Sequence, residues 1–315
     1  MQKLRSTLKA LAVAMLTLTI VCLAQAQAAR TWVASNGDDA FPCSRTSPCK
    51  TFAGAISKTD EGGEIDVIDP NSCGTVTISK ALTIDGGTGA GWASVQVTGT
   101  SGITVNVATS GLNHPDTAAV ILRNITFNGV AQTSGGHGNN GISYLRAERL
   151  YVENCVFENF TTAGINVDLT DAGSLWVKDC RFDKTTTGVK TTTTTGFAVT
   201  NIDHCRFSGM ANGVLAMSNS FATIRDSYFG GTTGATNGAV TAQTSSAVNV
   251  ESCMFANNVI GVNVAGGTVR LSNNDFFNNT SAIAGGTAPP TTTNSPVTPV
   301  TERPVMSSPS SNRPR

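Results

Sequence analysis

A six-residue pattern of apolar and polar positions recurs along this chain. A β-branched residue or leucine is followed by two polar positions, a small residue, any residue and then phenylalanine. The clearest copies occupy residues 152–157, 177–182 and 202–207, and looser copies surround them. The phenylalanines stand at positions 127, 157, 182, 207, 229, 255 and 276, with steps of 30, 25, 25, 22, 26 and 21 residues. Self-similarity at a period of about 20–50 residues predicts a solenoid.

A second marker, a glycine followed by an apolar residue, shares this period. It occurs at Gly141, Gly164, Gly188, Gly213, Gly238 and Gly261, with steps of 23, 24, 25, 25 and 23 residues. A leucine-rich repeat has an overlapping period but requires spaced leucines, and a propeller blade requires about 40 residues. Each repeat here accommodates three short strands joined by turns. The two markers therefore predict an all-β fold, a right-handed parallel β-helix of nine or ten coils.

Alternation of period two assigns the faces of the strands. In residues 152–157, Val152, Cys155 and Phe157 point inward, Glu153 points outward and Asn154 forms a bend. Coils stacked about 4.8 Å apart place equivalent residues directly above one another. The phenylalanines should therefore form an interior aromatic column. The bend positions, where short polar side chains can form a ladder, are Asn124, Asn154, Asp179, His204, Asp226, Ser252 and Asn273.

The outward position beside each bend tests this register. It is occupied in successive coils by Glu153, Lys178, Asp203, Arg225 and Glu251, which alternate in sign. Opposite charges on neighbouring strands are favourable and like charges are not. The alternation supports the assigned register and indicates that most of these charges are structural.

The chain divides into four segments. Residues 1–28 have a basic start, an apolar run of 13 residues at 11–23 and small residues at a cleavage site, which is typical of a signal peptide. The run is too short to cross a bilayer, which takes about 20 residues. The mature protein should therefore be secreted or periplasmic, without a membrane span. Residues 29–60 form an N-terminal cap, 61–286 the β-helix, and the Pro/Thr/Ser-rich tail at 287–315 is predicted to be disordered.

The N-terminal cap should close the first coil of the solenoid, whose strand edges and core would otherwise be exposed. A strand is expected at 31–33 and a short amphipathic helix at 51–58. Cys43 and Cys49 bracket a loop, and in an exported protein a disulfide is favoured over two free thiols. Early coils should contain strands without the phenylalanine pattern, at 75–78, 82–84, 95–97 and 103–107.

Charge excludes one class of partner. Charged residues make up 13% of the chain, about half of the ~25% usual for globular domains. Removal of residues 1–28 takes away three of the 21 basic residues and none of the 21 acidic ones, leaving a net charge of about −3. The sequence contains no basic patch, so nucleic acid is not expected as a partner.

Several segments resemble those of a known group. Residues 31–33, 48–52, 62–65 and 83–86 are similar to the opening of secreted bacterial β-helix proteins of the pectin-lyase-like superfamily. The resemblance covers roughly residues 30–286, and it implies the parallel β-helix fold and export. Better-known relatives act on acidic polysaccharides, but function does not travel with fold.

Four cysteines at a spacing of about one coil need a separate interpretation. Cys155, Cys180, Cys205 and Cys253 should stack inside the solenoid with parallel side chains. That geometry suits neither tetrahedral zinc nor a disulfide. We interpret them as small packing residues, and we expect no metal site. Cys73 has no evident partner in the sequence.

Two motifs lack the context that would give them meaning. His137 lies in a Gly-His-Gly segment that resembles one polygalacturonase motif, but the paired aspartates and the downstream basic segment are missing. The sequence of residues 136–141 also matches a dinucleotide-binding fingerprint, but this segment precedes a strand rather than a helix. Residues 85–91 resemble a calcium-binding nonapeptide, yet Gly91 stands where the ligating aspartate should be. His137 is therefore interpreted as a loop residue.

The outward strand positions supply the remaining candidates for a glycan-binding face. Asn166 and Asp168 point outward on one glycine-led strand and Lys190 on the next. On the phenylalanine-bearing strands, Arg181 and Arg206 fall on adjacent coils with Tyr228 above, and they are expected to lack the neutralisation found among the alternating charges. A uronate lyase needs cations, often calcium, and a base for proton abstraction. Calcium is therefore expected only if the protein is a lyase, and no other cofactor is expected.

Two hypotheses of function follow. The first is a non-catalytic secreted module that binds a polysaccharide or a cell-surface glycan along its strand faces, and the absence of an assembled motif favours it. The second is a polysaccharide-active enzyme, either a polyuronate lyase or a glycoside hydrolase, and it is suggested by the resemblance and by the candidate face.

Overall fold

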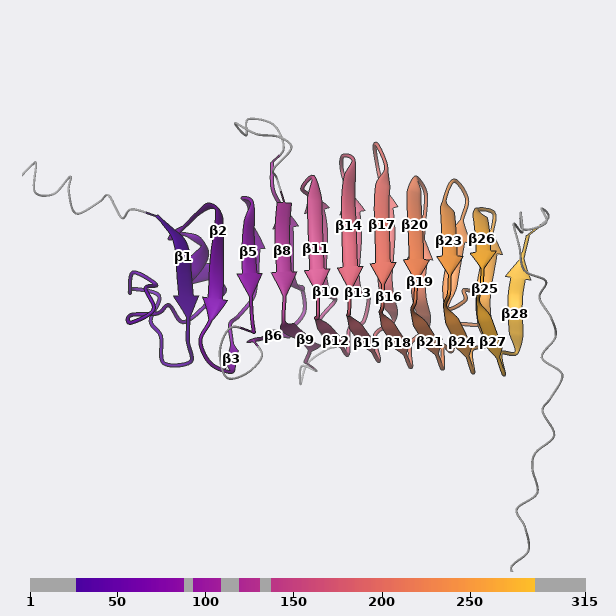
Figure 1. Ribbon diagram of the computed structural model, residues 1–315, viewed down its shortest axis with the longest axis horizontal. Coiled ribbons are helices and arrows are strands. Elements are labelled where there is room, and N and C mark those ends of the chain that lie inside the picture. Colours follow the sequence, from indigo (N-terminus) through magenta and orange to yellow (C-terminus); the bar gives the residue numbers. More distant parts are fainter. Residues whose placement is uncertain (1–26, 88–92, 109–118, 131–136, 287–315) are drawn as a thin grey trace, which may run out of the picture.

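The structure is a β-solenoid in which the chain winds through three parallel sheets (Figure 1). The computed structural model describes residues 27–87, 93–108, 119–130 and 137–286. The predicted signal peptide lies almost entirely outside these residues, and the predicted tail entirely so. Within the described chain, nine successive triplets of strands each contribute one strand to each sheet. The predicted parallel β-helix is confirmed.

Each sheet collects equivalent strands from successive coils. Sheet 1 consists of β1 (Ala28–Val33), β2 (Thr59–Val67), β5 (Leu82–Asp85), β8 (Ala119–Arg123), β11 (Arg149–Glu153), β14 (Gly173–Lys178), β17 (Ala198–Asp203), β20 (Ser220–Arg225), β23 (Ala247–Glu251) and β26 (Thr268–Ser272). Sheet 2 consists of β3 (Asn71–Ser72), β6 (Ala93–Val97), β9 (Ile125–Gly129), β12 (Val156–Glu158), β15 (Arg181–Asp183), β18 (Arg206–Ser208), β21 (Tyr228–Gly230), β24 (Met254–Ala256) and β27 (Asp275–Phe277). Sheet 3 consists of β4 (Val76–Ile78), β7 (Ser101–Asn106), β10 (Asn140–Arg146), β13 (Ala163–Leu169), β16 (Thr187–Thr193), β19 (Asn212–Ala216), β22 (Val240–Gln243), β25 (Ile260–Ala265) and β28 (Ser281–Gly285).

The predicted aromatic column runs through the core beneath sheet 2. Seven phenylalanines, from Phe127 to Phe276, stack with neighbouring ring centroids 4.6–5.0 Å apart and planes within 9° of parallel. The first six are fully buried, and Phe276, in the last coil, is half-buried. The ring spacing matches the spacing of the strands that carry the rings. The register predicted from the sequence is therefore correct at this position.

The glycine series packs directly against this column. A Cβ atom on Gly188 would lie 2.6 Å from both Cδ1 of Phe207 and the carbonyl oxygen of Gly213, and equivalent glycines meet the phenylalanine of the next coil in the same way. One member of the predicted series was wrong. Strand pairing of Val214 with Val240 places Ala239, and not Gly238, in this row. The corner that precedes β22 is longer than its neighbours, which moved the glycine out of phase.

In the coils from β11 onward, two corners are made by residues in the left-handed region. At the corner between sheets 1 and 2, Asn154, Asp179 and His204 have φ of 50°, 52° and 50°, and Asn154 Nδ2 donates to Asn124 Oδ1 at 2.8 Å. This is the predicted bend ladder. A second series, which was not predicted, turns the chain from sheet 2 to sheet 3; there Asn278 Nδ2 donates to Asn257 Oδ1 at 2.7 Å.

The stacked cysteines are buried and free, as predicted. Their position receives a backbone hydrogen bond from the preceding coil, because Cys155 N donates to Cys180 Sγ at 3.4 Å and Cys205 N to Ser227 Oγ at 3.1 Å. Any small acceptor can therefore occupy it. Burial raises the pKa of the Cys180 and Cys205 thiols well above their usual value. Burial also raises the pKa of Cys73 to about 12.

We expect these thiols to be unreactive until the protein unfolds. In denaturant, the mature chain should expose five free thiols, from Cys73 and the four stacked cysteines, whereas the native protein should react at few or none because thiolate formation requires solvent. Titration with a chromogenic disulfide reagent measures both values. Fewer than four thiols in the denatured, unreduced chain would contradict the packed column.

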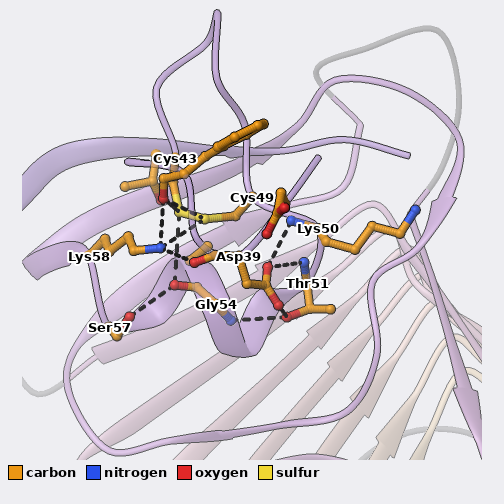
Figure 2. The surroundings of a disulfide bond; sticks show 12 residues. Asp39, Cys43, Cys49, Lys50, Thr51, Gly54, Ser57 and Lys58 are labelled. Carbon is orange, nitrogen blue, oxygen red and sulfur yellow. Dashed lines mark hydrogen bonds between the residues drawn. A yellow bond between two sulfur atoms is a disulfide. The ribbon is translucent and has the colours of Figure 1, made fainter. Parts of the chain in front are cut away.

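The N-terminal cap contains the predicted helix and disulfide. The helix α2 (Phe52–Ile56) is shorter than expected, begins after Thr51 and buries Phe52 and Ala55. Cys43 and Cys49 are joined beside it (Figure 2). Asp39 accepts hydrogen bonds from the backbone N–H of Lys50 and from the backbone and side chain of Thr51. Burial raises the pKa of Asp39, but these hydrogen bonds outweigh it and lower its pKa. These contacts hold the cap together, and the pairing of β1 with β2 and the hydrogen bond from Phe52 N to the Cys73 carbonyl oxygen join it to the first coil.

Candidate functional site

The structure separates the six predicted face residues onto two sheets. Asn166 and Lys190 are register partners on β13 and β16 of sheet 3, and both are half-buried. Asp168 is exposed but lies opposite Thr192, two residues along from Lys190. The sheet 3 residues therefore place an amide, and not a carboxylate, directly beside the lysine.

The other three residues form a row on sheet 2. Arg181, Arg206 and Tyr228 are register partners on β15, β18 and β21. The guanidinium of Arg206 lies 4.6 Å from the ring centroid of Tyr228. Arg181 forms an ion pair with Asp183 on its own strand. The expectation that these stacked cations lack neutralisation is therefore wrong for Arg181, because period-two alternation returns Asp183 to the same face.

His137 does not join either group. Its Nδ1 lies 2.8 Å from the carbonyl oxygen of Gly129, and the residue is exposed in the turn before β10. This agrees with its interpretation as a loop residue. Asp85, the first residue of the calcium-like segment, is described, whereas residues 88–92 of that region lie outside the described chain.

Sheet 1 also carries continuous rows of outward side chains. Three rows run along its outer face at successive outward positions of β11 to β26. We define the central row as Tyr151, Trp176, Asn201, Thr223, Asn249 and Arg270. We define the charge row as Glu153, Lys178, Asp203, Arg225, Glu251 and Ser272. We define the apolar-side row as Arg149, Ser174, Val199, Phe221, Ala247 and Thr268.

The central row begins with an aromatic pair and continues with hydrogen-bonding groups. The Tyr151 and Trp176 rings stack with centroids 4.9 Å apart at an angle of 15°, and both are half-buried. Asn201, Thr223 and Asn249 follow on the next three strands. From Trp176 to Arg270 the row crosses four strand spacings, roughly 19 Å at about 4.8 Å each. An apolar surface therefore passes into an amide- and hydroxyl-lined track on one rigid face.

The charge row has the register predicted from the sequence. Its alternating residues pair strand by strand, from Glu153 opposite Lys178 to Arg225 opposite Glu251. Arg225 Nε lies 3.3 Å from a Glu251 carboxylate oxygen. The row also continues beyond the predicted members, through Arg123 to Asp85 and Asp66.

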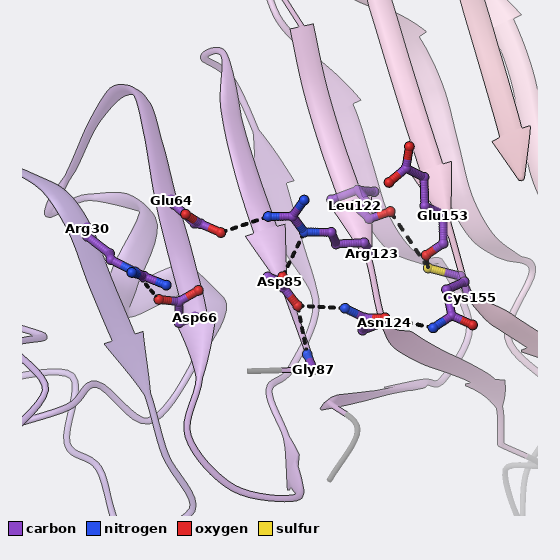
Figure 3. A network of polar contacts seen from close by, with 11 residues as sticks. Arg30, Glu64, Asp66, Asp85, Gly87, Leu122, Arg123, Asn124, Glu153 and Cys155 are labelled. Carbon is purple, nitrogen blue, oxygen red and sulfur yellow. Dashed lines mark hydrogen bonds and ion pairs between the residues drawn. The ribbon is translucent and has the colours of Figure 1, made fainter. Parts of the chain in front are cut away.

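At its N-terminal end this row becomes a network of ion pairs (Figure 3). Arg123 contacts Asp85 at 2.7 Å and Glu64 at 3.0 Å, while Arg30 pairs with the buried Asp66. Burial raises the pKa of Asp85, but hydrogen bonds from Asn124, Gly87 and Arg123 outweigh it and lower its pKa. Burial raises the pKa of Asp66, and the Arg30 contact only partly opposes this. These acids thus have structural partners.

A shallow pocket lies at the C-terminal end of the sheet 1 face. It has a volume of about 290 Å³, near the lower end of the range for small-ligand pockets. It is lined by Thr223, Arg225, Asn249, Val250, Glu251, Arg270, Leu271 and Ser272. The central row therefore ends in a depression bounded by two guanidinium groups.

The apolar-side row adds an exposed hydrophobic patch. Val199 and Phe221 are register partners with exposed fractions of 41% and 43%. Phe197, in the preceding corner, is 55% exposed, and its ring centroid lies 5.5 Å from that of Phe221. Contiguous exposed aromatic groups mark interaction surfaces more often than scattered ones do.

The bend ladder brings one metal-like group together. Asp203, His204 and Asp226 have ligand atoms within 4.8 Å of one another, which is the only such group in the described parts of the chain. His204 Nδ1 lies 2.9 Å from Asp203 Oδ1, and His204 and Asp226 are exposed. His204 and Asp226 occupy bend positions that asparagine fills in other coils, so the ladder accounts for their proximity.

Sequence reasoning did not identify the central row or the pocket. The signal was present, because Tyr151 and Trp176 each stand two residues before a member of the predicted charge row. The same alternation that predicts outward Glu153 and Lys178 also predicts these side chains on the same face. The pocket requires the side chains of three coils and has no counterpart in a short motif.

Comparison with known proteins agrees with this architecture. Residues 71–229 match the family model described as the right handed beta helix region, and the chain belongs to this family. The solenoid is thus a right-handed parallel β-helix. It is similar to the crystal structure of pectate lyase Pel9A, with 17% identity and a TM-score of 0.55 over 78% of this chain and 69% of that one. No curated protein matches.

A second solved structure is less similar. The Azotobacter vinelandii mannuronan C-5 epimerase AlgE4 A-module matches with 12% identity and a TM-score of 0.26, over 70% of this chain and 88% of that one.

Among the described residues, no helix has the length and apolar character needed to span a membrane.

Proposed function

We propose that this chain is an exported, non-catalytic module that binds a polysaccharide lengthwise along the outer face of sheet 1. The central row is the observation that carries this proposal. It aligns two aromatic side chains, three amide or hydroxyl side chains and a guanidinium on six consecutive parallel strands. Export is proposed from the signal-like residues 1–28.

The chemistry of the row suits an extended sugar polymer. Sugars present apolar C–H surfaces and many hydroxyl groups, and Tyr and Trp combine apolar area with a polar atom. Asn and Thr side chains both donate and accept hydrogen bonds. Because strands hold these groups, little conformational entropy is lost when a ligand binds. A repeating ligand would meet a repeating surface.

The partners of the charged candidates support a binding role. Arg181 pairs with Asp183, Arg225 pairs with Glu251, and Asp168 lies opposite Thr192 rather than Lys190. A glycosidase requires two carboxyl groups about 5–9.5 Å apart in a substrate site. The acids of the Asp66 and Asp85 network are instead engaged by Arg30 and Arg123.

A polysaccharide-active enzyme, a polyuronate lyase or a glycoside hydrolase, is the second candidate. The fold shared with a pectate lyase over 78% of the chain favours it. On sheet 3, Lys190 lies beside Asn166, whose Oδ1 is buried without a hydrogen-bond partner. In this alternative, Lys190 would be the base and calcium would be supplied by the medium or substrate.

One experiment separates the two functions. Mature protein is incubated with neutral and acidic polysaccharides, with and without calcium, and both binding and products are measured. We expect binding without turnover. Trp176→Ala should weaken this binding about tenfold or more, and a tenfold loss of affinity corresponds to about 1.4 kcal/mol. Phe277→Ala, which removes an exposed aromatic of sheet 2, is the matched control and should bind normally. Unsaturated or shortened products that disappear in Lys190→Ala would establish the enzyme instead.

A further inference from the structure

We infer that the pocket at the end of the central row holds an oxyanion carried by the glycan, a carboxylate or a sulfate on a sugar unit. This inference rests on the proposed function and specifies its ligand class. The pocket spans β20, β23 and β26, the last three strands of sheet 1. Arg225 and Arg270 lie diagonally across β23, one on each side of Glu251 and Asn249.

The two guanidinium groups have unequal partners. Arg225 Nε lies 3.3 Å from Glu251, so its charge is neutralised within the pocket. Arg270 Nη1 donates only a long bond of 3.5 Å to the neutral Asn249 amide oxygen, and Arg270 forms no ion pair among the described residues. The lining thus contains two cations and one anion, a surplus of one positive charge.

On the outer face of sheet 1 from β8 to β26, Arg270 is the only described cation with neither an ion pair nor an acidic register partner. On the same face, Lys178 lies between Glu153 and Asp203, and Arg123 contacts both Asp85 and Glu64. The neighbours of Arg270 along the central row are instead Asn249 and then Thr223, which carry no charge. An anion bound to Arg270 therefore does not compete with a carboxylate of the described protein.

Guanidinium chemistry identifies the ligand class. Its planar fork donates two parallel hydrogen bonds to a carboxylate or sulfate, and such charge-assisted bonds are stronger than neutral ones. Thr223, Ser272 and Asn249 surround the site with groups that can bond sugar hydroxyls. Glu251 forms an ion pair with Arg225, and its carboxylate oxygens can also accept a hydrogen bond from a sugar hydroxyl. A neutral sugar would leave Arg270 with only its long amide contact.

The test compares three polymers and two variants of the full mature chain. Affinity for polygalacturonate, for a sulfated galactan and for a neutral galactan is measured with the wild type, Arg270→Gln and Lys184→Asn. Lys184 is an exposed cation at the corner between sheets 2 and 3, where Asn159 and Asn257 occupy equivalent positions. Lys184→Asn therefore removes the same charge without disturbing the backbone. Circular dichroism verifies that each variant is folded.

We expect Arg270→Gln to weaken binding of one acidic polymer about 10- to 100-fold, far more than it weakens binding of the neutral polymer, while Lys184→Asn changes neither. The polymer affected distinguishes carboxylate from sulfate. Unchanged affinity of Arg270→Gln for both acidic polymers would overturn the inference of an anion site. The proposed function would still hold in that case if the neutral polymer binds and Trp176→Ala weakens its binding. Failure of all three polymers to bind would refute both.

Discussion

Replacement of Phe207 by alanine is expected to lower the free energy of unfolding by about 3–5 kcal/mol. Phe207 is fully buried, and its ring lies between those of Phe182 and Phe229 at 4.7 and 4.6 Å. Its removal would leave a cavity in the middle of the column, where the strands on either side fix the spacing and prevent collapse. Urea unfolding followed by circular dichroism measures the change.

Phe277→Ala provides the control for this substitution. Phe277 stands next to the last ring of the column, but it points outward with 63% of its surface exposed. Its replacement should change stability by no more than about 0.5 kcal/mol. If Phe207→Ala were as mild as Phe277→Ala, the phenylalanine column would not be the source of the solenoid's stability, and the recurring pattern would need another explanation.

The sequence predicted best those features that depend on the strand register between neighbouring coils. The phenylalanine column and the pairing of Arg225 with Glu251 depend only on the strand register. A register shift of one residue would turn inward side chains outward, so the apolar pattern determines it strongly. For that reason a single sequence sufficed to place both an interior column and an exterior row.

The errors arose where corner length or side-chain reach decides the structure. The regular spacing predicts Gly238 in the glycine row, but the longer corner before β22 places Ala239 there. The residues of neighbouring coils leave Arg181 without a neutralising partner, whereas Asp183 pairs with it along the same strand. Spacing in sequence therefore predicts the row but not the corner that leads into it.

The proposed binding face was missed for a related reason. Motif reasoning looks for chemistry within a short segment, but Trp176 and Arg270 are 94 positions apart and meet only as members of one row. In a solenoid, outward positions tolerate many residues because they do not affect the core. A functional surface can accordingly consist of one residue from each coil, and it is recognised only when the strands are aligned.

The second large effect is expected for Gly188→Val, which should destabilise the protein by about 3 kcal/mol or more, at the upper end for overpacking. The new Cβ would lie 2.6 Å from the Phe207 ring and 2.6 Å from the carbonyl oxygen of Gly213. Neither can retreat, because the ring is stacked on both faces and the carbonyl belongs to an adjacent strand. Gly188→Ala should fall between valine and wild type, since Ala239 fills this position in another coil.

Gly209→Asn, at the corner between sheets 2 and 3 in the next coil, is the matched control. Gly209 has φ of +63°, and a Cβ there would meet nothing within 4 Å. Asparagine adopts similar angles at the equivalent corner residues Asn159 and Asn257. This variant should therefore keep its stability within about 0.5 kcal/mol or gain slightly, because it restricts the unfolded chain. Equal tolerance of valine at 188 and asparagine at 209 would show that the glycine series reflects turn preference rather than contact with the aromatic column.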